Sequence, residues 1–302
     1  MQDRKVLLTG AAGYVAAQLL PAFRQRFDLT LTDVVDTDRD GRTVDGVEIS
    51  DLTVADRSQY ARLFEGQDAV VHLGYKRRRW DLLDDFFDEQ LNVAMAYNVF
   101  RSAYEAGVKR VVMASSNHAA DWYEHNLIHE RKLENLDPYR LPLSDNFYGW
   151  AKATYEHIGF VFASGVFGRK LEVVMVRIGA PREIRTEDFP DNPRGYKRDL
   201  GAYLSPRDLT QLIRRAIEAP AIENEHGIPW QVVYGISDNT RAFWSLESAR
   251  KYLGYCPQDD SEVSFAEGIR EILTSPGADA GPGRAGGAGE IEFLIRRPPV
   301  TG

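Results

Sequence analysis

A tyrosine and a lysine stand four residues apart in the segment YGWAK, residues 148–152. If this segment is helical, Tyr148 and Lys152 share one face, where an ammonium group can act on a phenol. Tyrosine is a poor base at neutral pH, because its unperturbed pKa is about 10. A nearby cation favours the phenolate and lowers that pKa, so the phenol can then take a proton from a substrate hydroxyl. The pair predicts proton abstraction from an alcohol, although the same spacing is common on ordinary helices.

A run of hydrogen-bonding side chains ends an apolar stretch in VVMASSNHAADWY, residues 111–123. The small and β-branched residues before it are typical of a strand buried on both faces. The stretch stops at Ser115, Ser116, Asn117 and His118. Hydroxyl, amide and imidazole groups at the end of a buried strand indicate a binding site for a polar ligand.

A glycine turn, TGAAGYVA at residues 9–16, follows one apolar run and precedes a helical pattern. Gly10 permits the tight turn, Gly13 lets the backbone approach a pyrophosphate, and Ala16 takes the position where helix packs on strand. Backbone N–H groups at the start of the helix then face the anion. Asp33 ends the next strand, where its carboxylate can accept hydrogen bonds from an adenosine ribose. The pattern predicts a dinucleotide site that prefers NAD, because a carboxylate repels the 2′-phosphate of NADP.

Alternatives to this interpretation stay open at several positions. Asp33 could be a turn cap, and Arg39 and Arg42, which follow it, could receive the phosphate of NADP. Asp51 and Gly74 end the third and fourth expected strands, where ligands bind in parallel sheets. Asp51 could hold the adenine and Gly74 could let the backbone approach the dinucleotide, or both could serve only their turns.

Strand-like and helical segments alternate along the chain. We expect strands at 5–10, 29–33, 46–50, 68–74, 109–116, 171–178 and 230–237, and helices at 14–27, 57–66, 81–106, 149–164, 206–218, 245–253 and 264–273. Such alternation predicts a parallel sheet with helices on both faces and right-handed crossovers. The expected fold class is a doubly wound α/β Rossmann sheet, with a small substrate-side lobe from the C-terminal half.

Composition suggests how the chain is divided. The segment 179–205 is rich in Pro, Gly and charge and reads as loops over a site. We expect residues 1–178 to form the NAD-binding core and residues 179–274 to form a substrate-side lobe interleaved with it. Residues 275–302 read as a Gly/Ala/Pro linker followed by a tail that is either disordered or docked through its apolar run.

Charge and cysteine content exclude several classes of protein. The 302 residues carry a net charge of −8, whereas a nucleic-acid partner requires a basic face. No apolar run is long enough to span a bilayer, and the N-terminus lacks the apolar region of a signal peptide. The single cysteine, Cys256, cannot form an internal disulfide. These properties predict a cytoplasmic protein with a small-molecule partner.

The glycine turn, the strand-end serine and the Tyr-x-x-x-Lys pair occur in the order found in extended short-chain dehydrogenases/reductases. The chain resembles that family up to about residue 274. The resemblance implies that Ser116 hydrogen-bonds the reacting oxygen, that Tyr148 is the base, and that Lys152 assists Tyr148 and holds the nicotinamide ribose. Asn92 matches the helix asparagine that supports the active site in the family. The NAD contacts expected from the resemblance are Gly10, Ala12, Gly13, Tyr14, Val15, Asp33, Asp51, Leu52, Leu73, Gly74, Asn92, Lys152 and Ile178.

Three segments narrow the resemblance to one branch. ASSNHA (114–119), VRIG (176–179) and VVYGISDN (232–239) are similar to segments of NAD-dependent uronate dehydrogenases and related hexose 1-dehydrogenases. This resemblance implies oxidation of the anomeric carbon of a sugar to a lactone. The substrate contacts it implies are Ser116, Asn117, His118, Tyr148 and Arg198. Arg198 would bind the carboxylate of a uronate, and Lys197 and Arg194 are close enough in sequence to take the same role.

The chain departs from that branch in three places. YKRRRW (75–80) replaces a small polar residue, a longer stretch separates Asn117 from Tyr148, and the C-terminal tail is rich in glycine. A run of positive charge is usually a solvated loop, but this one follows the fourth strand and lines the substrate end of the site. We hypothesise that Arg77 or a neighbour binds a carboxylate, sulfonate or phosphate, for which a guanidinium fork is suited.

An NAD-dependent sugar 1-dehydrogenase is therefore the leading interpretation. A nucleotide-sugar epimerase or dehydratase with retained NAD, and a non-catalytic dinucleotide-binding regulator, are the alternatives. His118, His125 and His129 lack a compact set of ligands at zinc spacing, so no metal is expected. The helices at 81–106 and 149–164 could pair in a homo-oligomer.

Overall fold

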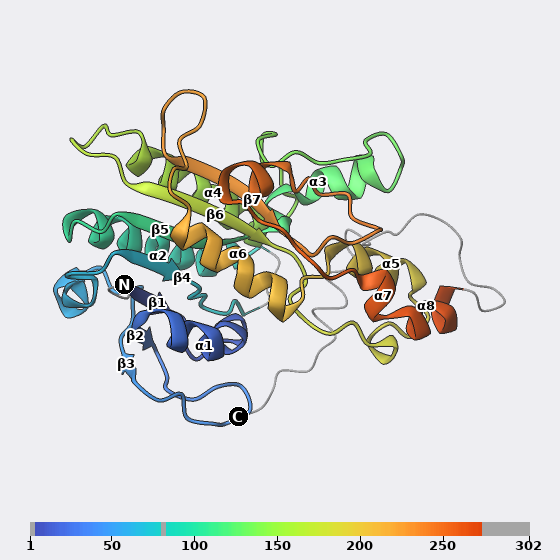
Figure 1. The fold of residues 1–302 in the computed structure, drawn as a ribbon, viewed down its shortest axis with the longest axis horizontal. Coiled ribbons are helices and arrows are strands. Elements are labelled where there is room, and N and C mark those ends of the chain that lie inside the picture. Colours follow the sequence, from blue (N-terminus) through green and yellow to red (C-terminus); the bar gives the residue numbers. More distant parts are fainter. Residues whose placement is uncertain (1–3, 80–82, 274–302) are drawn as a thin grey trace.

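The computed structural model describes residues 4–79 and 83–273. Its centre is a seven-stranded sheet, all parallel, in the order β3-β2-β1-β4-β5-β6-β7 (Figure 1). The strands are β1 (Lys5–Thr9), β2 (Asp28–Asp33), β3 (Val47–Ile49), β4 (Ala69–His72), β5 (Arg110–Ser116), β6 (Glu172–Ile178) and β7 (Trp230–Gly235). The expected doubly wound Rossmann sheet is confirmed. The strand order reverses between β1 and β4, which is where ligands bind in such sheets.

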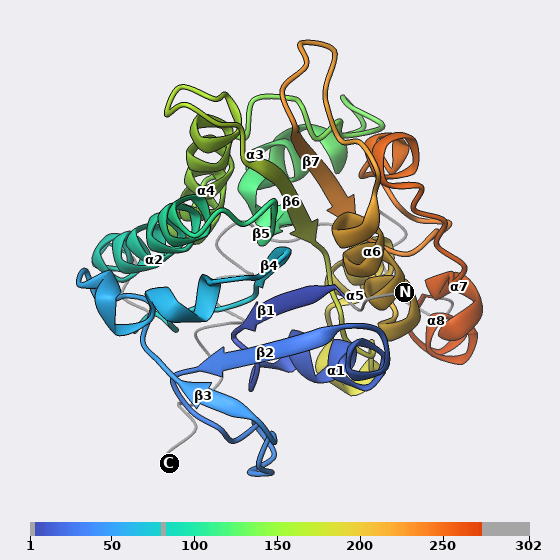
Figure 2. The ribbon, with the colours of Figure 1, turned by 60° about the vertical axis from the view of Figure 1, so that its left-hand side comes forward.

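Helices cover both faces of the sheet (Figure 2). On one face lie α1 (Tyr14–Arg26) and α6 (Pro206–Glu218), and on the other lie α2 (Asp85–Glu105) and α4 (Phe147–Ala163). Side chains of β5 alternate between the two: Val112 belongs to the first hydrophobic cluster, whereas Val111 and Met113 belong to the second. Because successive strand residues point to opposite faces, a continuous apolar strand can support two cores at once.

A third, smaller hydrophobic cluster lies beyond the carboxyl end of the sheet. It is formed around α5 (Pro193–Ala202) and α8 (Ala266–Leu273), with α7 (Ser261–Ser264) packed beside them. Helix α5 begins where the Asn192 side chain accepts a hydrogen bond from the Gly195 N–H, and Pro193 occupies the first turn. Both are helix-start signals. The expectation that residues 179–205 are loops throughout was therefore wrong.

Two other expected helices differ in the structure. Residues 57–66 form two 3₁₀ turns, Arg57–Gln59 and Ala61–Phe64, instead of one amphipathic helix. Tyr60 separates them with a φ of −137° and a ψ of −2°, which are not helical, and its hydroxyl donates to the Val54 carbonyl. The region 245–253 contains a single π-helical turn that ends at Gly254, whose φ is +66°. Among the described residues, no helix is both long and apolar enough to cross a membrane.

Candidate functional site

The glycine turn lies between β1 and α1, beside the carboxyl end of β4. Gly10 has a φ of +71°, and a Cβ at this position would lie 2.6 Å from the Gly74 nitrogen. Gly13 precedes the first turn of α1 without a capping side chain. The Ala12 N–H donates to the Asp33 carboxylate over 2.9 Å. The turn thus combines close backbone approach, an open helix N-terminus and an acidic neighbour, which are the features that a dinucleotide requires.

The other expected cofactor contacts surround this turn. Tyr14 opens α1 and Val15 packs partly against the core, while the Leu73 N–H donates to the Thr9 carbonyl and draws β4 toward Gly10. Ile178 ends β6 directly opposite Ser116 in β5. The structure brings these side chains to one edge of the sheet.

Two positions have structural partners that match the alternative interpretation. The Asp51 carboxylate accepts bonds from the Thr53 N–H (2.8 Å) and the Thr53 hydroxyl (2.7 Å), so it caps its own turn. Leu52 is buried, and its carbonyl accepts a bond from Asn98. Contact of Asp51 and Leu52 with adenine stays a prediction.

Arg39 and Arg42, the alternative partners for a 2′-phosphate, differ in their surroundings. Arg42 is bound to Asp38 and Asp40. The Arg39 guanidinium lies 4.0 Å from the centre of the Tyr14 ring, above the start of α1. Arg39 is therefore the nearer of the two arginines to the glycine turn.

Helix α4 positions Tyr148, the tyrosine predicted to be the base. The Asn146 side chain caps it by accepting the Gly149 N–H (2.9 Å), so Tyr148 lies in the first turn. A Cβ at Gly149 would lie 2.0 Å from the His118 carbonyl oxygen, so glycine lets α4 pack tightly against the end of β5. The Ser116 side chain lies near enough to the Tyr148 phenol to lower the pKa of that phenol. Two residues far apart in sequence are thereby brought together as predicted.

The electrostatics of Tyr148 differ from the expectation. Burial raises its pKa to about 12, and it outweighs the hydrogen bond from Ser116 and the charge of Arg78, which both lower it. The prediction that a neighbouring ammonium lowers this pKa below its ordinary value was wrong for the structure described. Lys152 lies one turn further along α4, with its Nζ 5.6 Å from the centre of the Tyr148 ring.

Lys152 is itself buried. Its Nζ donates to the Ala114 carbonyl over 3.1 Å. Burial lowers its pKa to about 8, and the charge of Glu89 opposes that change. Glu89, which is fully buried, is therefore the acidic group whose charge partly offsets the effect of burial on Lys152.

The start of the basic segment after β4 is held against α2. Asn92 brackets Lys76: its Oδ1 accepts the Lys76 N–H (2.8 Å) and its Nδ2 donates to the Lys76 carbonyl (2.9 Å). The Tyr75 hydroxyl donates to Glu89 over 2.6 Å. Tyr75 also packs edge-on against Tyr148, with ring centres 5.4 Å apart. Asn92 thus holds the backbone of this segment, and its support of the active site stays a prediction.

The arginines of the segment have distinct partners. Arg78 forms an ion pair with the buried Asp85 (3.1 Å), and Arg79 forms one with Asp88 (3.1 Å). Arg77 is exposed, and no ion pair joins it to any residue in the described part of the chain. The segment is therefore tied to α2 by these ion pairs although Lys76, Arg77 and Arg79 are exposed, and binding of an anion by Arg77 or a neighbour stays a prediction.

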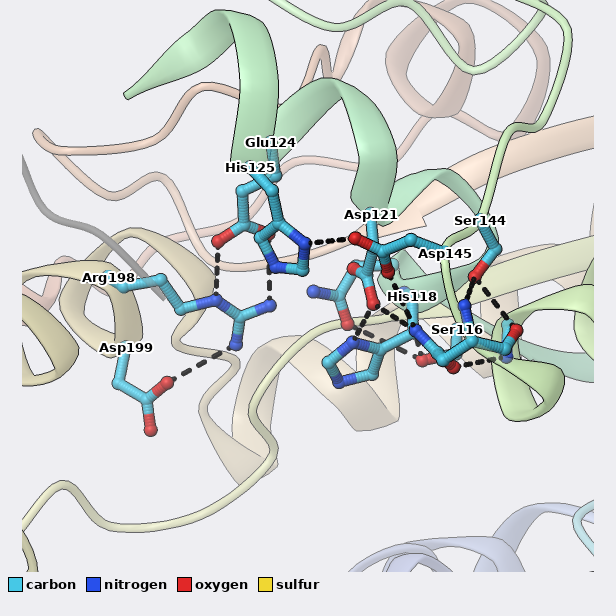
Figure 3. Close-up of polar contacts among 12 residues, drawn as sticks. Ser116, His118, Asp121, Glu124, His125, Ser144, Asp145, Arg198 and Asp199 are labelled. Atoms are coloured by element: carbon cyan, nitrogen blue, oxygen red, sulfur yellow. Dashed lines mark hydrogen bonds and ion pairs between the residues drawn. The ribbon is translucent and has the colours of Figure 1, made fainter. Parts of the chain in front are cut away.

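The expected sugar contacts His118 and Asn117 follow Ser116 in a 3₁₀ turn. His118 Nδ1 lies 2.7 Å from the Asp121 carboxylate, and the Asn146 amide donates to the same carboxylate over 3.0 Å (Figure 3). The His118 ring centre is 5.7 Å from that of Tyr148. If Nδ1 carries the proton toward Asp121, Nε2 becomes the acceptor that a sugar hydroxyl needs.

Arg198, on α5, is not open to a substrate carboxylate in the structure. Its Nε and Nη2 meet the two carboxylate oxygens of Glu124 at 2.8 and 3.2 Å (Figure 3). Arg198 therefore lies at the site with this edge of its guanidinium on an internal carboxylate, and its contact with a uronate carboxylate stays a prediction.

Each of the three histidines once considered as metal ligands pairs with one acidic side chain. His125 is bound to Asp145 at 2.6 Å and His129 to Glu124 at 3.2 Å. Burial opposes the charge on His125, but the hydrogen bond to Asp145 raises its pKa to about 9. Within the described ranges, no group of three or more His, Cys, Asp or Glu side chains could hold a metal ion.

Comparison with known families decides the wider relationship. Residues 6–177, which are more than half of the chain, match the model of the "NAD dependent epimerase/dehydratase family". The chain belongs to this family. The matched range contains the glycine turn, Ser116, Tyr148 and Lys152. The family is described as NAD dependent.

Relatives within the family include sugar dehydrogenases. The chain is 32% identical to an NAD-dependent glucose-6-phosphate dehydrogenase of Haloferax volcanii, covering 88% of this chain and 97% of that protein. It is 34% identical to a uronate dehydrogenase of Pseudomonas syringae, covering 87% and 85%. The crystal structure of a glucuronic acid dehydrogenase from Chromohalobacter salexigens matches with a TM-score of 0.70 and 27% identity, covering 97% of both chains.

The residues that sequence reasoning missed are acidic or aromatic partners of predicted ones. They are Tyr75, Glu89, Asp121 and Glu124. A signal existed for Glu89, which is three residues before Asn92 and so shares its helix face. Glu124 lies in the stretch noted as longer than expected, but nothing in the sequence joins it to Arg198.

Proposed function

We propose that this protein oxidises a sugar at its anomeric carbon to a lactone, with NAD as the oxidant. The observation that carries the proposal is the convergence of Ser116, His118 and Tyr148 at the carboxyl end of β5, next to the glycine turn. A hydroxyl donor, an imidazole acceptor and a phenol suit a polyhydroxylated substrate whose reacting group is an alcohol.

Each of these residues has its own role in the proposed reaction. Ser116 hydrogen-bonds the anomeric oxygen, and Tyr148 as phenolate takes its proton. Asn117 and His118 orient the ring hydroxyls. Lys152 supplies positive charge beside Tyr148 and contacts the nicotinamide ribose. When bound at the Gly10–Asp33 turn, NAD accepts the hydride from the anomeric carbon.

We further propose that the substrate carries an anionic group recognised by the segment 75–79. Arg77 is exposed there, and Arg78 lies beside Tyr148, so the segment offers positive charge next to the reacting sugar. The two named relatives act on uronate and on glucose 6-phosphate, which are both anionic sugars. A carboxylate and a phosphate are both suitable ligands for a guanidinium.

We also propose a domain division, a cellular location and an oligomeric state. Residues 1–178 would bind NAD, residues 179–274 would form the substrate-side lobe, and the protein would act in the cytoplasm. A homodimer through α2 and α4 is supported by exposed apolar side chains on both helices. These are Phe87, Leu91, Tyr97, Trp150, Phe160 and Val161. Molar mass from light scattering tests the dimer, and a monomer at micromolar concentration would exclude it.

The direct test is a screen of free aldoses, uronates, sulfo-sugars and sugar phosphates, measured by NADH formation. The Tyr148→Phe variant should lose turnover by at least about 100-fold, because it lacks the base, while NAD binding stays unchanged. A nucleotide-sugar epimerase would give no steady NADH signal with any free sugar. Full activity in Tyr148→Phe would refute the mechanism.

A further inference from the structure

The ion pair between Arg198 and Glu124 is almost completely enclosed. The two side chains are 5% and 1% exposed. One edge of the guanidinium, Nε and Nη2, meets both oxygens of the carboxylate, which is the geometry by which arginine binds any carboxylate. The fork that could receive a ligand carboxylate is therefore filled from within the chain.

This pair lies directly behind the reacting position. With the Asn117 amide oriented so that its nitrogen donates to the Ile178 carbonyl (3.0 Å), its oxygen accepts from Arg198 Nη2 (2.5 Å). Asn117 follows Ser116, which holds the reacting oxygen in the proposed function. Asn117 thus links Arg198 to the end of β5 that carries Ser116, and Figure 3 shows Arg198 with Glu124 and Asp199 beside this end of the strand.

The acidic groups beside Arg198 are already paired, since Asp199 is bound by Arg182 as well. Arg198 Nη1 also contacts Asp199 at 3.3 Å. Burial opposes the charge on Glu124, but Arg198 and His129 outweigh it and lower the pKa of Glu124 well below its ordinary range. Glu124 is therefore ionised, and a ligand carboxylate brought to Arg198 would meet two carboxylates that are already in place.

We propose that Glu124 is a specificity-determining residue that supplies an internal carboxylate to Arg198 and so excludes sugars that carry a carboxylate at that end of the site. The inference rests on the proposed function and deepens it. The sugar presents neutral hydroxyls toward Arg198 and Asn117, and its anionic group lies on the side of the segment 75–79. Removing Glu124 should open the Arg198 fork to a uronate.

The test compares binding of D-glucuronate with binding of D-glucose, its neutral analogue, by titration calorimetry. All proteins carry Tyr148→Phe and are saturated with NAD, so that binding is measured without turnover. Glu124→Gln and Glu124→Ala should each shift the ratio of the two dissociation constants toward glucuronate by about tenfold or more. A ratio within about twofold of the unaltered value in both variants would overturn the proposal.

The chain offers a matched control in the pair of Glu156 with Arg177. It has the same two-point geometry, at 2.8 Å for both contacts, and its side chains are 2% and 1% exposed. Glu156→Gln should leave the glucuronate-to-glucose ratio unchanged; an equal shift there would also overturn the proposal.

A second measurement applies if the Glu124 variants do not fold. Removal of Glu124 leaves Arg198 with less compensation in a buried position, which destabilises the protein. If the Glu124 variants do not fold, about 20 mM formate should restore a cooperative thermal transition by replacing the carboxylate, and no restoration would count against the proposal. Because every readout is binding or folding, failure of the dehydrogenase assignment would appear separately, as absence of NADH formation by the wild type with every sugar.

Discussion

The guanidinium carbon of Arg78 lies 5.5 Å from the centre of the Tyr148 ring. The same guanidinium forms a 3.1 Å ion pair with Asp85, and both side chains are nearly enclosed. A cation in this position favours the phenolate, and its charge lowers the pKa of Tyr148, although burial raises that pKa more. The basic segment after β4 is therefore linked to the reacting base as well as to the substrate end of the site.

Replacing Arg78 should lower the fraction of Tyr148 that is ionised. In Arg78→Gln the pKa of Tyr148 rises further, so a smaller fraction of phenolate forms at neutral pH. We expect kcat at pH 7 to fall about tenfold, with the rise in activity displaced to higher pH. Arg78→Lys keeps the charge and should restore most of the activity. A uniform loss of kcat at all pH values would show that Arg78 acts only on folding or substrate binding.

Arg77 should determine recognition of the anionic group. Because it is exposed and no described residue forms an ion pair with it, its replacement removes little internal structure. Arg77→Ala should raise KM for glucose 6-phosphate about tenfold and change KM for glucose by less than about twofold. Arg79→Ala, which removes a side chain bound to Asp88 in the same segment, is the control. Equal effects of Arg77→Ala on both sugars would refute this role.

The local pattern of apolar and polar residues was sufficient to predict the sheet and the helices that cover it. Apolar strands alternating with amphipathic helices could form only a parallel sheet with two covered faces, and strand ends in such a sheet converge. The rule placed Ser116 at the ligand-binding edge of the sheet, whereas its pairing with Tyr148 was implied by the resemblance to extended short-chain dehydrogenases/reductases. The prediction of one helix at 57–66 was wrong. The apolar spacing of this segment suits a helix, but Asp56 caps a 3₁₀ turn and the Tyr60 hydroxyl donates to the Val54 carbonyl.

The charge partners of the site could not be predicted in the same way. Arg198 and Glu124 are 74 residues apart and meet only after α5 packs against the stretch that follows β5. Sequence spacing gives no information on such a pair, so Arg198 was expected to be available to a substrate carboxylate. A role for Glu89 was easier to predict, because Glu89 lies three residues before Asn92 on the same helix. Its effect on Lys152 depends on burial, which sequence does not show.

Asp33 should control the choice between NAD and NADP. Its carboxylate lies at the end of β2 and accepts the Ala12 N–H of the glycine turn. Asp33→Ser keeps an acceptor for that N–H but removes the charge that repels a 2′-phosphate, with Arg39 close to the turn. We expect the ratio of kcat/KM for NAD to that for NADP to fall about 10- to 100-fold. Asp36→Ser, in the same loop, should leave the ratio unchanged, and an unaltered ratio in Asp33→Ser would contradict the assignment.

Lys152 should reduce the stability of the fold while serving catalysis. Its pKa falls from an ordinary value of 10.5 to about 8, mainly because of burial. A lysine with a lowered folded-state pKa destabilises the protein at low pH, since the unfolded chain binds the proton more tightly between pH 8 and 10.5. The difference corresponds to about 3 kcal/mol below pH 8 and disappears as the pH rises to 10.5.

Lys152→Met should therefore abolish turnover and increase the free energy of unfolding at pH 7. Urea denaturation at pH 7 and at about pH 10 tests this, because the advantage of the variant should be up to about 3 kcal/mol at the lower pH and much smaller at the higher one. Lys170→Met is the control, since Lys170 is exposed and should show no such pH-dependent difference. A gain that is the same at both pH values would show that Met improves packing alone, and that the buried charge of Lys152 is not what destabilises the native state.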